Sequence, residues 1–296
     1  MQRYPFILAV AIVAETAVIS GCSLLIEPGT NAATDGAPDA DVGNTCALGP
    51  FDSFDASRLD LDGLLNGDAV HPSLTDDEQT LFFENRRGGE IYLYRVDGFD
   101  PGDDNHDAVP AGPAVNTVVG PSLSPDGSSL IYSSWDNTLL GFVPRTADLR
   151  APSYNQALGE PVDTFLRETY VGPNDGGFLA RSGGVMVFQN LSTAEMFELT
   201  CTASTCNPSF ITWGVAPFLR DDGDLLVYQH DDGIYAQVRD GAKFSDVPVS
   251  LWSYNEPLPV LTSPWLSRNR CVLYFADEHD GQLHIYRAEK PVPDDA

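Results

Sequence analysis

The chain has 296 residues, of which 16 are basic and 43 acidic, so its formal net charge at pH 7 is −27. A surface of this sign repels phosphate groups, which excludes nucleic acids and anionic lipid headgroups as partners held by charge. The length leaves room for a domain with a large hydrophobic core.

The first 21 residues have the composition of an export signal. A basic residue and an apolar stretch are followed by the small residues Ser20 and Gly21, directly before Cys22. This ending resembles the bacterial lipobox, in which cleavage leaves the cysteine at the new N-terminus with lipid attached. Glu15 interrupts the apolar stretch, which then falls short of the roughly 20 residues that a membrane-spanning helix needs. The sequence therefore predicts a signal peptide over residues 1–21, lipidation of Cys22 and membrane attachment through lipid alone.

Residues 22–50 are predicted to carry the lipid and to act as a flexible tether. From Glu27 to Thr45 the chain contains no aromatic residue and no β-branched run. Such a segment cannot bury enough apolar surface to order itself.

A strand–turn–strand pattern begins after the tether and recurs along the chain. In GPSLSPDGSSLIYSS (Gly120–Ser134), Pro125, Asp126 and Gly127 form the turn of a hairpin, because proline presets φ and glycine accepts a positive φ. The copies start 40 to 56 residues apart, with a leucine two residues and an aromatic residue eleven residues after each start. The five copies start at Pro72, Pro121, Gly177, Pro217 and Pro264.

A period of this length, built from short strands, predicts a β-propeller in which each repeat is one four-stranded blade. The copies resemble the WD-repeat-like repeats of TolB-type propellers, whose core reads P-x-L-S-P-D-G-x-x-L-x-F, and the resemblance covers residues 51–290. We therefore expect an all-β, five-bladed propeller, although TolB-type propellers usually have six blades, and six remains the alternative. A β-sandwich whose turns coincide by chance is the competing fold.

The segment FDSFDASRLDLDGLL (Phe51–Leu65) precedes the first copy and resembles an outer strand. It is predicted to complete the last blade and close the ring, which protects sheet edges from pairing with other chains. Residues 291–296 form a tail.

Four cysteines follow Cys22, an even number for an oxidising compartment. Cys201 and Cys206 are placed to bridge a loop after the third blade. A disulfide between Cys46 and Cys271 would then attach the closing segment to the last blade. Buried free thiols are the alternative for both pairs.

The acidic loop around residue 103 is a candidate for a metal site. Asp103, Asn105 and Asp107 offer oxygen ligands at alternate positions, as calcium loops do. No glycine follows in the required place, and Ala114 stands where a glutamate is needed. A solvated acidic loop is the favoured interpretation, and no other cofactor is predicted.

Catalytic motifs are missing from the sequence. It contains no G-x-S-x-G elbow, no H-E-x-x-H and no Walker-type phosphate loop. Some five-bladed propellers hydrolyse sugars with carboxylates from their inner strands, a reaction that requires two acids facing one substrate. The inner-strand positions predicted to face the axis here carry no carboxylate.

The same axial positions carry bulky side chains in consecutive blades. Alternation along the inner strands places these residues on one side: Phe178, Phe218, Arg220 and Trp265. They line a pocket or plug a narrow channel, and the sequence favours the plug.

The functional prediction combines these features. We expect an exported, lipid-anchored propeller that acts as a non-catalytic binding module in the bacterial cell envelope, in the outer membrane, the periplasm or at the cell surface. An envelope protein or glycan is the expected partner, and a carbohydrate-active hydrolase or lyase using the axial face is the alternative.

Overall fold

The computed structural model divides the chain into two compact units, Met1–Ala37 and Pro38–Ala296. All described residues lie in the second unit. They are residues 45–52, 56–61, 67–88, 90–103, 107–111, 118–123, 127–136, 141–149, 160–161, 179–182, 185–190, 193–201, 206–220, 223–231, 233–254 and 264–292. Within this part of the chain, no helix has the length and apolar character needed to cross a bilayer.

The described strands form five antiparallel sheets, each one blade. Blade 1 contains β2 (Asp68–Leu74), β3 (Thr80–Arg87), β4 (Glu90–Asp97) and β5 (Val109–Pro110). Blade 2 contains β6 (Val118–Leu123), β7 (Ser129–Asp136), β8 (Gly141–Asp148) and β9 (Glu160–Pro161). Blade 3 contains β10 (Leu179–Ser182), β11 (Val185–Asn190), β12 (Glu195–Cys201) and β13 (Cys206–Trp213).

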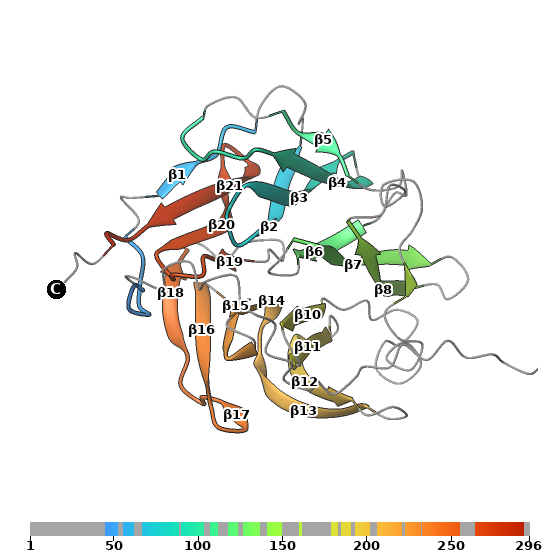
Figure 1. Cartoon of the computed structure of the whole chain (residues 1–296), viewed down its shortest axis with the longest axis vertical. Coiled ribbons are helices and arrows are strands. Elements are labelled where there is room, and N and C mark those ends of the chain that lie inside the picture. The colour runs from blue at the N-terminus through green and yellow to red at the C-terminus, as the bar shows by residue number, and fades with distance from the viewer. Residues whose placement is uncertain are drawn as a thin grey trace, which may run out of the picture. The chain divides into compact units, whose positions relative to one another are not determined.

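The last two blades vary this plan. Blade 4 contains β14 (Val215–Arg220), β15 (Leu225–His230), β16 (Gly233–Asp240), β17 (Lys243–Phe244) and β18 (Val249–Ser253), the last two both paired with β16. Blade 5 contains β19 (Trp265–Leu266), β20 (Val272–His279), β21 (Gln282–Glu289) and, from the other end of the sequence, β1 (Ala56–Arg58). Figure 1 shows the sheets following one another in a ring, with the first strand of each repeat toward the middle. The prediction of an all-β, five-bladed propeller is confirmed.

The shared leucine and aromatic residue of the repeats form the core. The leucines whose side chains are described are all buried: Leu74, Leu123, Leu219 and Leu266. The aromatic residues are buried as well: Phe83, Tyr132, Phe188, Tyr228 and Phe275. Because both positions face neighbouring blades, the pattern recurs in one register around the ring.

The turn after each inner strand keeps one backbone conformation although its sequence changes. Gly127 has a φ of +64°, as the Pro-Asp-Gly turn predicts. The equivalent residues in three other copies also have positive φ: Glu78, Gly223 and Arg270. Two of these lack the glycine that favours this conformation, so neighbouring contacts must hold Glu78 and Arg270 in place.

Each start proline of blades 1, 2 and 4 lies in a β-bulge between the first two strands. The residue before it has positive φ: His71, Gly120 and Ala216. In two bulges the freed backbone N–H donates to a buried side chain of the preceding blade. Gly120 donates to Glu84, and Ala216 donates to Gln189 at 2.6 Å. These contacts tie consecutive blades together.

The ring closes as predicted, through a strand from the N-terminal side of the first repeat. Ala56, Ser57 and Arg58 of β1 pair antiparallel with Ala288, Arg287 and Tyr286 of β21. The backbone N–H of Leu59 continues this pairing by donating to Ile285 at 2.9 Å. The outer edge of the last blade is therefore covered by residues that precede blade 1 in the sequence.

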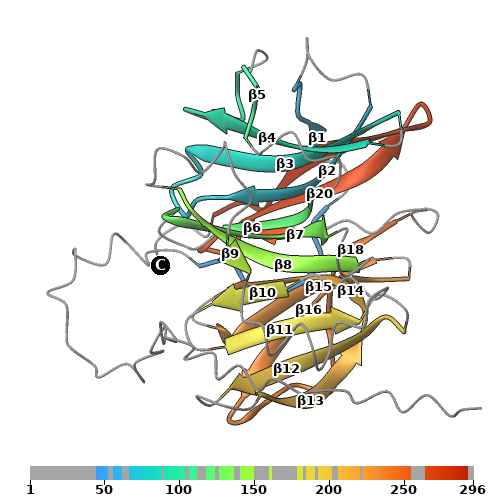
Figure 2. The same cartoon turned by 90° about the vertical axis from the view of Figure 1, so that its right-hand side faces the viewer.

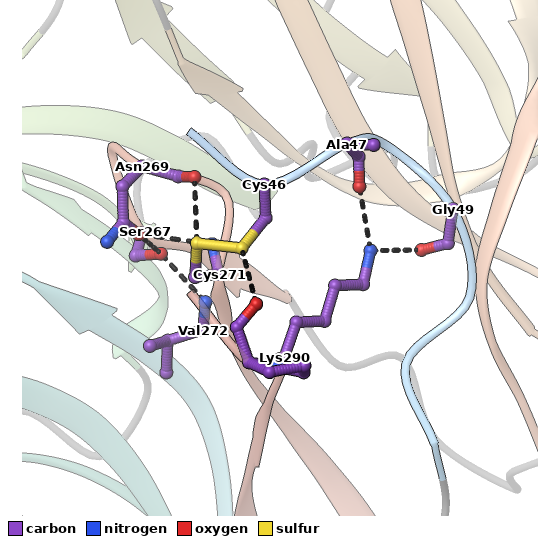
Figure 3. The surroundings of a disulfide bond; sticks show 9 residues. Cys46, Ala47, Gly49, Ser267, Asn269, Cys271, Val272 and Lys290 are labelled. Carbon is purple, nitrogen blue, oxygen red and sulfur yellow. Dashed lines mark hydrogen bonds between the residues drawn. A yellow bond between two sulfur atoms is a disulfide. The ribbon is translucent and has the colours of Figure 1, made fainter. Parts of the chain in front are cut away.

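A second closure lies just before β1, in residues 45–52, which we call the strap. Cys46 forms a disulfide with Cys271, across 225 sequence positions, and its backbone N–H donates to Asn269 at 2.8 Å. Figure 3 shows the Lys290 ammonium donating to the carbonyls of Ala47 and Gly49, at 3.0 and 2.7 Å. The predicted pairing of Cys46 with Cys271 is thus present in the structure.

Candidate functional site

The axial cluster predicted from the sequence is brought together by the ends of two inner strands. Phe218 and Arg220 lie on β14 and Trp265 begins β19, and their exposed fractions are only 7%, 5% and 1%. The Arg220 guanidinium carbon lies 5.1 Å from the Phe218 ring centre and 4.7 Å from that of Trp265. The two ring centres are themselves 6.1 Å apart, so the cation contacts both aromatic rings from one side. Phe178, the fourth predicted member, lies outside the described residues.

Side-chain hydrogen bonds at axial positions join three consecutive pairs of inner strands. Arg220 donates twice to the Leu266 carbonyl, from Nε at 2.9 Å and from Nη2 at 2.6 Å. Trp265 Nε1 donates to the Leu74 carbonyl at 3.0 Å. In blade 1, Ser73 Oγ accepts the Leu123 N–H at 2.9 Å. The axial side chains of blades 1, 4 and 5 thus hold the ring together from inside.

A set of polar side chains, which we call the axial rim, lies beside this cluster: Asp76, Glu78, Tyr274 and Arg287. Asp76 forms an ion pair with Arg220, and its side chain is 27% exposed. Tyr274 donates to Glu78 Oε2 at 2.9 Å and accepts from Arg287 Nε at 3.0 Å. The rim therefore combines groups from the turn after β2 with groups from β20 and β21.

Burial controls the protonation of Glu78 and Tyr274. It raises the pKa of Glu78, against the opposing effects of the Tyr274 hydrogen bond and of Arg287. Burial, together with the charge of Glu78, also raises the pKa of Tyr274 well above that of an ordinary tyrosine. Tyr274 therefore stays a hydrogen-bond donor at neutral pH, and Glu78 keeps its proton to a higher pH than a solvated glutamate.

A separate buried ionic group lies at the bulge of blade 1. His71 Nδ1 contacts Glu84 Oε1, and both side chains are fully buried. Arg86 donates to Glu84 Oε2 from Nε and Nη2, each at 3.3 Å. Burial alone raises the pKa of Glu84, but His71, Arg86 and the Gly120 N–H outweigh it and lower the pKa. His71 and Arg86 thus stabilise the charged Glu84 carboxylate, which accepts the Gly120 N–H at the junction between blades 1 and 2.

Sequence reasoning missed these polar groups for an identifiable reason. Asp76 and Glu78 stand where the repeat motif has Ser-Pro-Asp-Gly, and that motif predicts only a turn at these positions. A charged residue at the positive-φ position of a turn was the available signal. Asp76 and Arg220 are 144 positions apart, and Glu78 and Tyr274 are 196 positions apart, so only the ring brings each pair together.

The remaining predicted site residues have different outcomes. Cys22 and Asn105 lie outside the described residues. In the part of the chain that the structure describes, no three His, Cys, Asp or Glu side chains form a group suited to a metal ion. Cys201 and Cys206 are register partners on β12 and β13; a bond between them stays a prediction.

Comparison with solved structures finds distant likenesses. TolB from Acinetobacter baumannii is 14% identical with a TM-score of 0.44, over 76% of this chain and 55% of TolB, so the chain spans little more than half of that protein. A periplasmic gluconolactonase from Pseudomonas aeruginosa is 16% identical with a TM-score of 0.40, over 79% and 76%. The catalytic domain of a GH62 α-L-arabinofuranosidase from Coprinopsis cinerea is 10% identical with a TM-score of 0.47, over 84% and 97%.

No protein-family model and no curated protein sequence matches the chain. The structural neighbours include both a TolB and sugar-acting enzymes. Likenesses at these identities and TM-scores favour neither binding nor hydrolysis.

The geometry indicates what the axial end can do chemically. Arg220 and Trp265 donate side-chain hydrogen bonds to carbonyls of the neighbouring inner strands. Asp76 is the partly exposed carboxylate beside them, and Glu78 and Tyr274 add hydrogen-bonding groups. Such a rim suits recognition of a donor-rich ligand or protein surface at the axis.

Proposed function

We propose that this chain is an exported, lipid-anchored propeller that acts as a non-catalytic binding module in the bacterial cell envelope. Its partner is an envelope protein or glycan, recognised at the axial rim. The export signal, the lipobox-like Ser20-Gly21-Cys22 and the flexible tether support the location.

The ion pair of Asp76 with Arg220 carries the proposal. Arg220 is 5% exposed and is fixed by the Leu266 carbonyl and two aromatic rings, whereas Asp76 stays 27% exposed. The Asp76 carboxylate is thereby held at the surface by the guanidinium of Arg220, whose own position is fixed. A preorganised charge of this kind gives specificity in recognition, because little ordering is required on binding.

The alternative function, glycan hydrolysis, requires a pair of facing carboxylates. On the described inner strands, Asp68 is the one carboxylate, and its Oδ1 accepts the Leu283 N–H at 3.0 Å. The second acid would have to come from elsewhere on the ring. This observation supports placing binding first.

The test compares two Asp→Asn variants in a pull-down from detergent-solubilised bacterial envelopes. Asp76→Asn should lose the captured partner, whereas Asp280→Asn should retain it, because Asp280 has a 90% exposed side chain in the turn between β20 and β21. Melting temperatures check that both variants fold. Equal capture by both variants would remove the axial rim as the site.

A turnover assay completes the test. Purified protein is incubated with envelope glycans and polysaccharides, with and without calcium. Turnover that disappears on neutralising particular Asp or Glu residues near the channel mouth would overturn the proposal in favour of hydrolysis.

A further inference from the structure

The outer edge of blade 3 differs from every other outer edge of the ring. Three blades end in strands of two or three residues: β5, β9 and β1. Blade 4 ends in the two-residue β17 and the five-residue β18. Blade 3 ends in β13, which has eight residues. Figures 1 and 2 both place β13 at the outer margin of the molecule.

The short outer strands carry features that discourage pairing with other chains. Pro110 and Pro161 lie in β5 and β9, and Arg58 and Lys243 in β1 and β17. Prolines, charges and short length are the usual means of protecting a sheet edge. The sequence of β13, CNPSFITW, contains no charged residue, and its proline, Pro208, lies in its first half. The second half of β13 is therefore an unprotected edge.

Two large aromatic side chains are exposed on this half. Phe210 is 45% and Trp213 is 56% exposed. Their rings meet edge to face with centres 4.8 Å apart, and Phe197 packs against Phe210 at 5.9 Å. A bulge opposite Met196 and Phe197 sets this arrangement, since bulges redirect side chains on edge strands. The aromatic residues form one ordered platform.

The charge beside the platform is acidic. Glu195 is the register partner of Trp213. Glu198, the partner of Ser209, instead forms an ion pair with Arg239 at 3.0 Å. The whole chain carries a net charge of −27. An aromatic face beside a carboxylate attracts a lysine or arginine side chain through both the ring and the charge.

Within the described elements, β13 pairs with β12 alone, and its other edge has no strand partner. A second copy of this chain would bring another net charge of −27 to the same edge, which repulsion opposes. The tether is excluded on similar grounds, because residues 27–45 contain Glu27, Asp35, Asp39 and Asp41 and no basic residue. A cationic partner fits the observed charges.

We propose that β13 binds an extended, cationic segment of a partner protein by β-strand addition, with a lysine or arginine of that segment over Trp213 and beside Glu195. Main-chain hydrogen bonds to the free edge supply affinity, and the Trp213–Glu195 pair supplies selection for basic residues. This inference deepens the proposed binding function and rests on it, but it uses a surface separate from the axial rim.

The experiment uses a fluorescent eight-residue peptide of alternating lysine and valine with blocked ends, and follows its anisotropy with the full chain. We expect saturable binding that weakens about tenfold or more in Trp213→Ala, as for aromatic anchors at interfaces. Thr212→Lys, which adds a charge to the same edge, should weaken binding similarly. Val247→Ala, which alters a 75% exposed side chain on blade 4, should leave binding unchanged.

Three controls separate strand addition from other causes. A glutamate–valine peptide should not bind. Two further lysine–valine peptides carry N-methyl groups on one or the other alternate set of backbone amides. Only one of these two peptides should bind weakly, because only one set of amides faces the edge of β13. Equal binding of both methylated forms, or equal binding by Trp213→Ala, would show attraction by charge alone and overturn the inference. Concentration-dependent dimerisation or neutral-oligosaccharide binding, either one abolished by Trp213→Ala, would overturn it too.

The two proposals fail separately. Loss of peptide binding with continued capture of an envelope partner through Asp76 would remove only the edge site. Glycan turnover would remove the proposed function and leave peptide binding at β13 intact.

Discussion

The indole of Trp265 donates a 3.0 Å hydrogen bond to the carbonyl of Leu74, although 191 positions separate the two residues. This bond joins the inner strand of the last blade to that of the first. It is the inner counterpart of the pairing between β1 and β21 at the outer edge. The ring is therefore closed twice at the same junction, and the strap adds a third connection through Cys46 and Cys271.

Removing the inner closure should lower stability. Trp265→Phe keeps most of the ring volume but leaves the buried Leu74 carbonyl without this donor, which costs about 1–2 kcal/mol. Trp265→Ala also opens a cavity in the core and should cost about 3–5 kcal/mol. Urea denaturation measures both. Trp213→Ala, at a 56% exposed position, is the control and should stay within about 0.5 kcal/mol of the wild type.

Breaking the Cys46–Cys271 disulfide should destabilise the whole ring, because the bond closes a loop across 225 positions. Replacing both cysteines by serine should lower the free energy of unfolding by about 2–5 kcal/mol. Reducing agent should lower the melting temperature of the wild type toward that of the double variant and leave the double variant unchanged. A wild-type protein insensitive to reduction would contradict this prediction.

Deleting residues 51–65 should expose the edge of β21 that β1 covers, and the truncated protein should aggregate. Light scattering and size-exclusion chromatography measure this. Leu59→Ala is a milder version, since Leu59 is 5% exposed, and should cost about 2–5 kcal/mol. A truncated chain that stays monomeric with an unchanged melting temperature would show that β1 is dispensable for closure.

Glu78 should make stability depend on pH. Its pKa is raised above 4.5 in the folded protein, so the unfolded chain releases this proton first. The folded state then loses stability as the pH rises through the folded pKa, and none of this loss is present below about pH 4. Glu78→Gln lacks the titrating carboxyl group, so its free energy of unfolding relative to that of the wild type should increase from pH 4 to pH 8. Parallel urea titrations at the two pH values test the sign.

Cys22 should determine membrane attachment. With lipid on this residue, the wild-type protein partitions into detergent and labels with a fatty-acid probe. Cys22→Ser should abolish both, while Cys201→Ser should leave both intact. Labelling that survives in Cys22→Ser would contradict the lipoprotein prediction.

The repeat determined much of this protein from the sequence alone. Five copies of the repeat have a leucine and an aromatic residue at the same two positions. This pattern predicted the blades and the buried side chains within them, because each blade packs against its neighbours in the same way. The Pro-Asp-Gly turn predicted the positive φ of Gly127. The outer strand after residue 51 followed from the number of copies that fit the chain. These features are local or periodic, so a single sequence contains them.

Only the tertiary structure decided how the closing ends of the ring meet. Asp76 with Arg220, Glu78 with Tyr274, and Trp265 with Leu74 join residues 144 to 196 positions apart. Neither periodicity nor spacing encodes such pairs, because each side chain alone is compatible with solvent or with many partners. The same holds for β13: its length and its exposed Phe210 and Trp213 distinguish it only beside the shorter outer strands that the ring places around it. Closing a ring brings distant residues together, and that closure is a property of the whole chain.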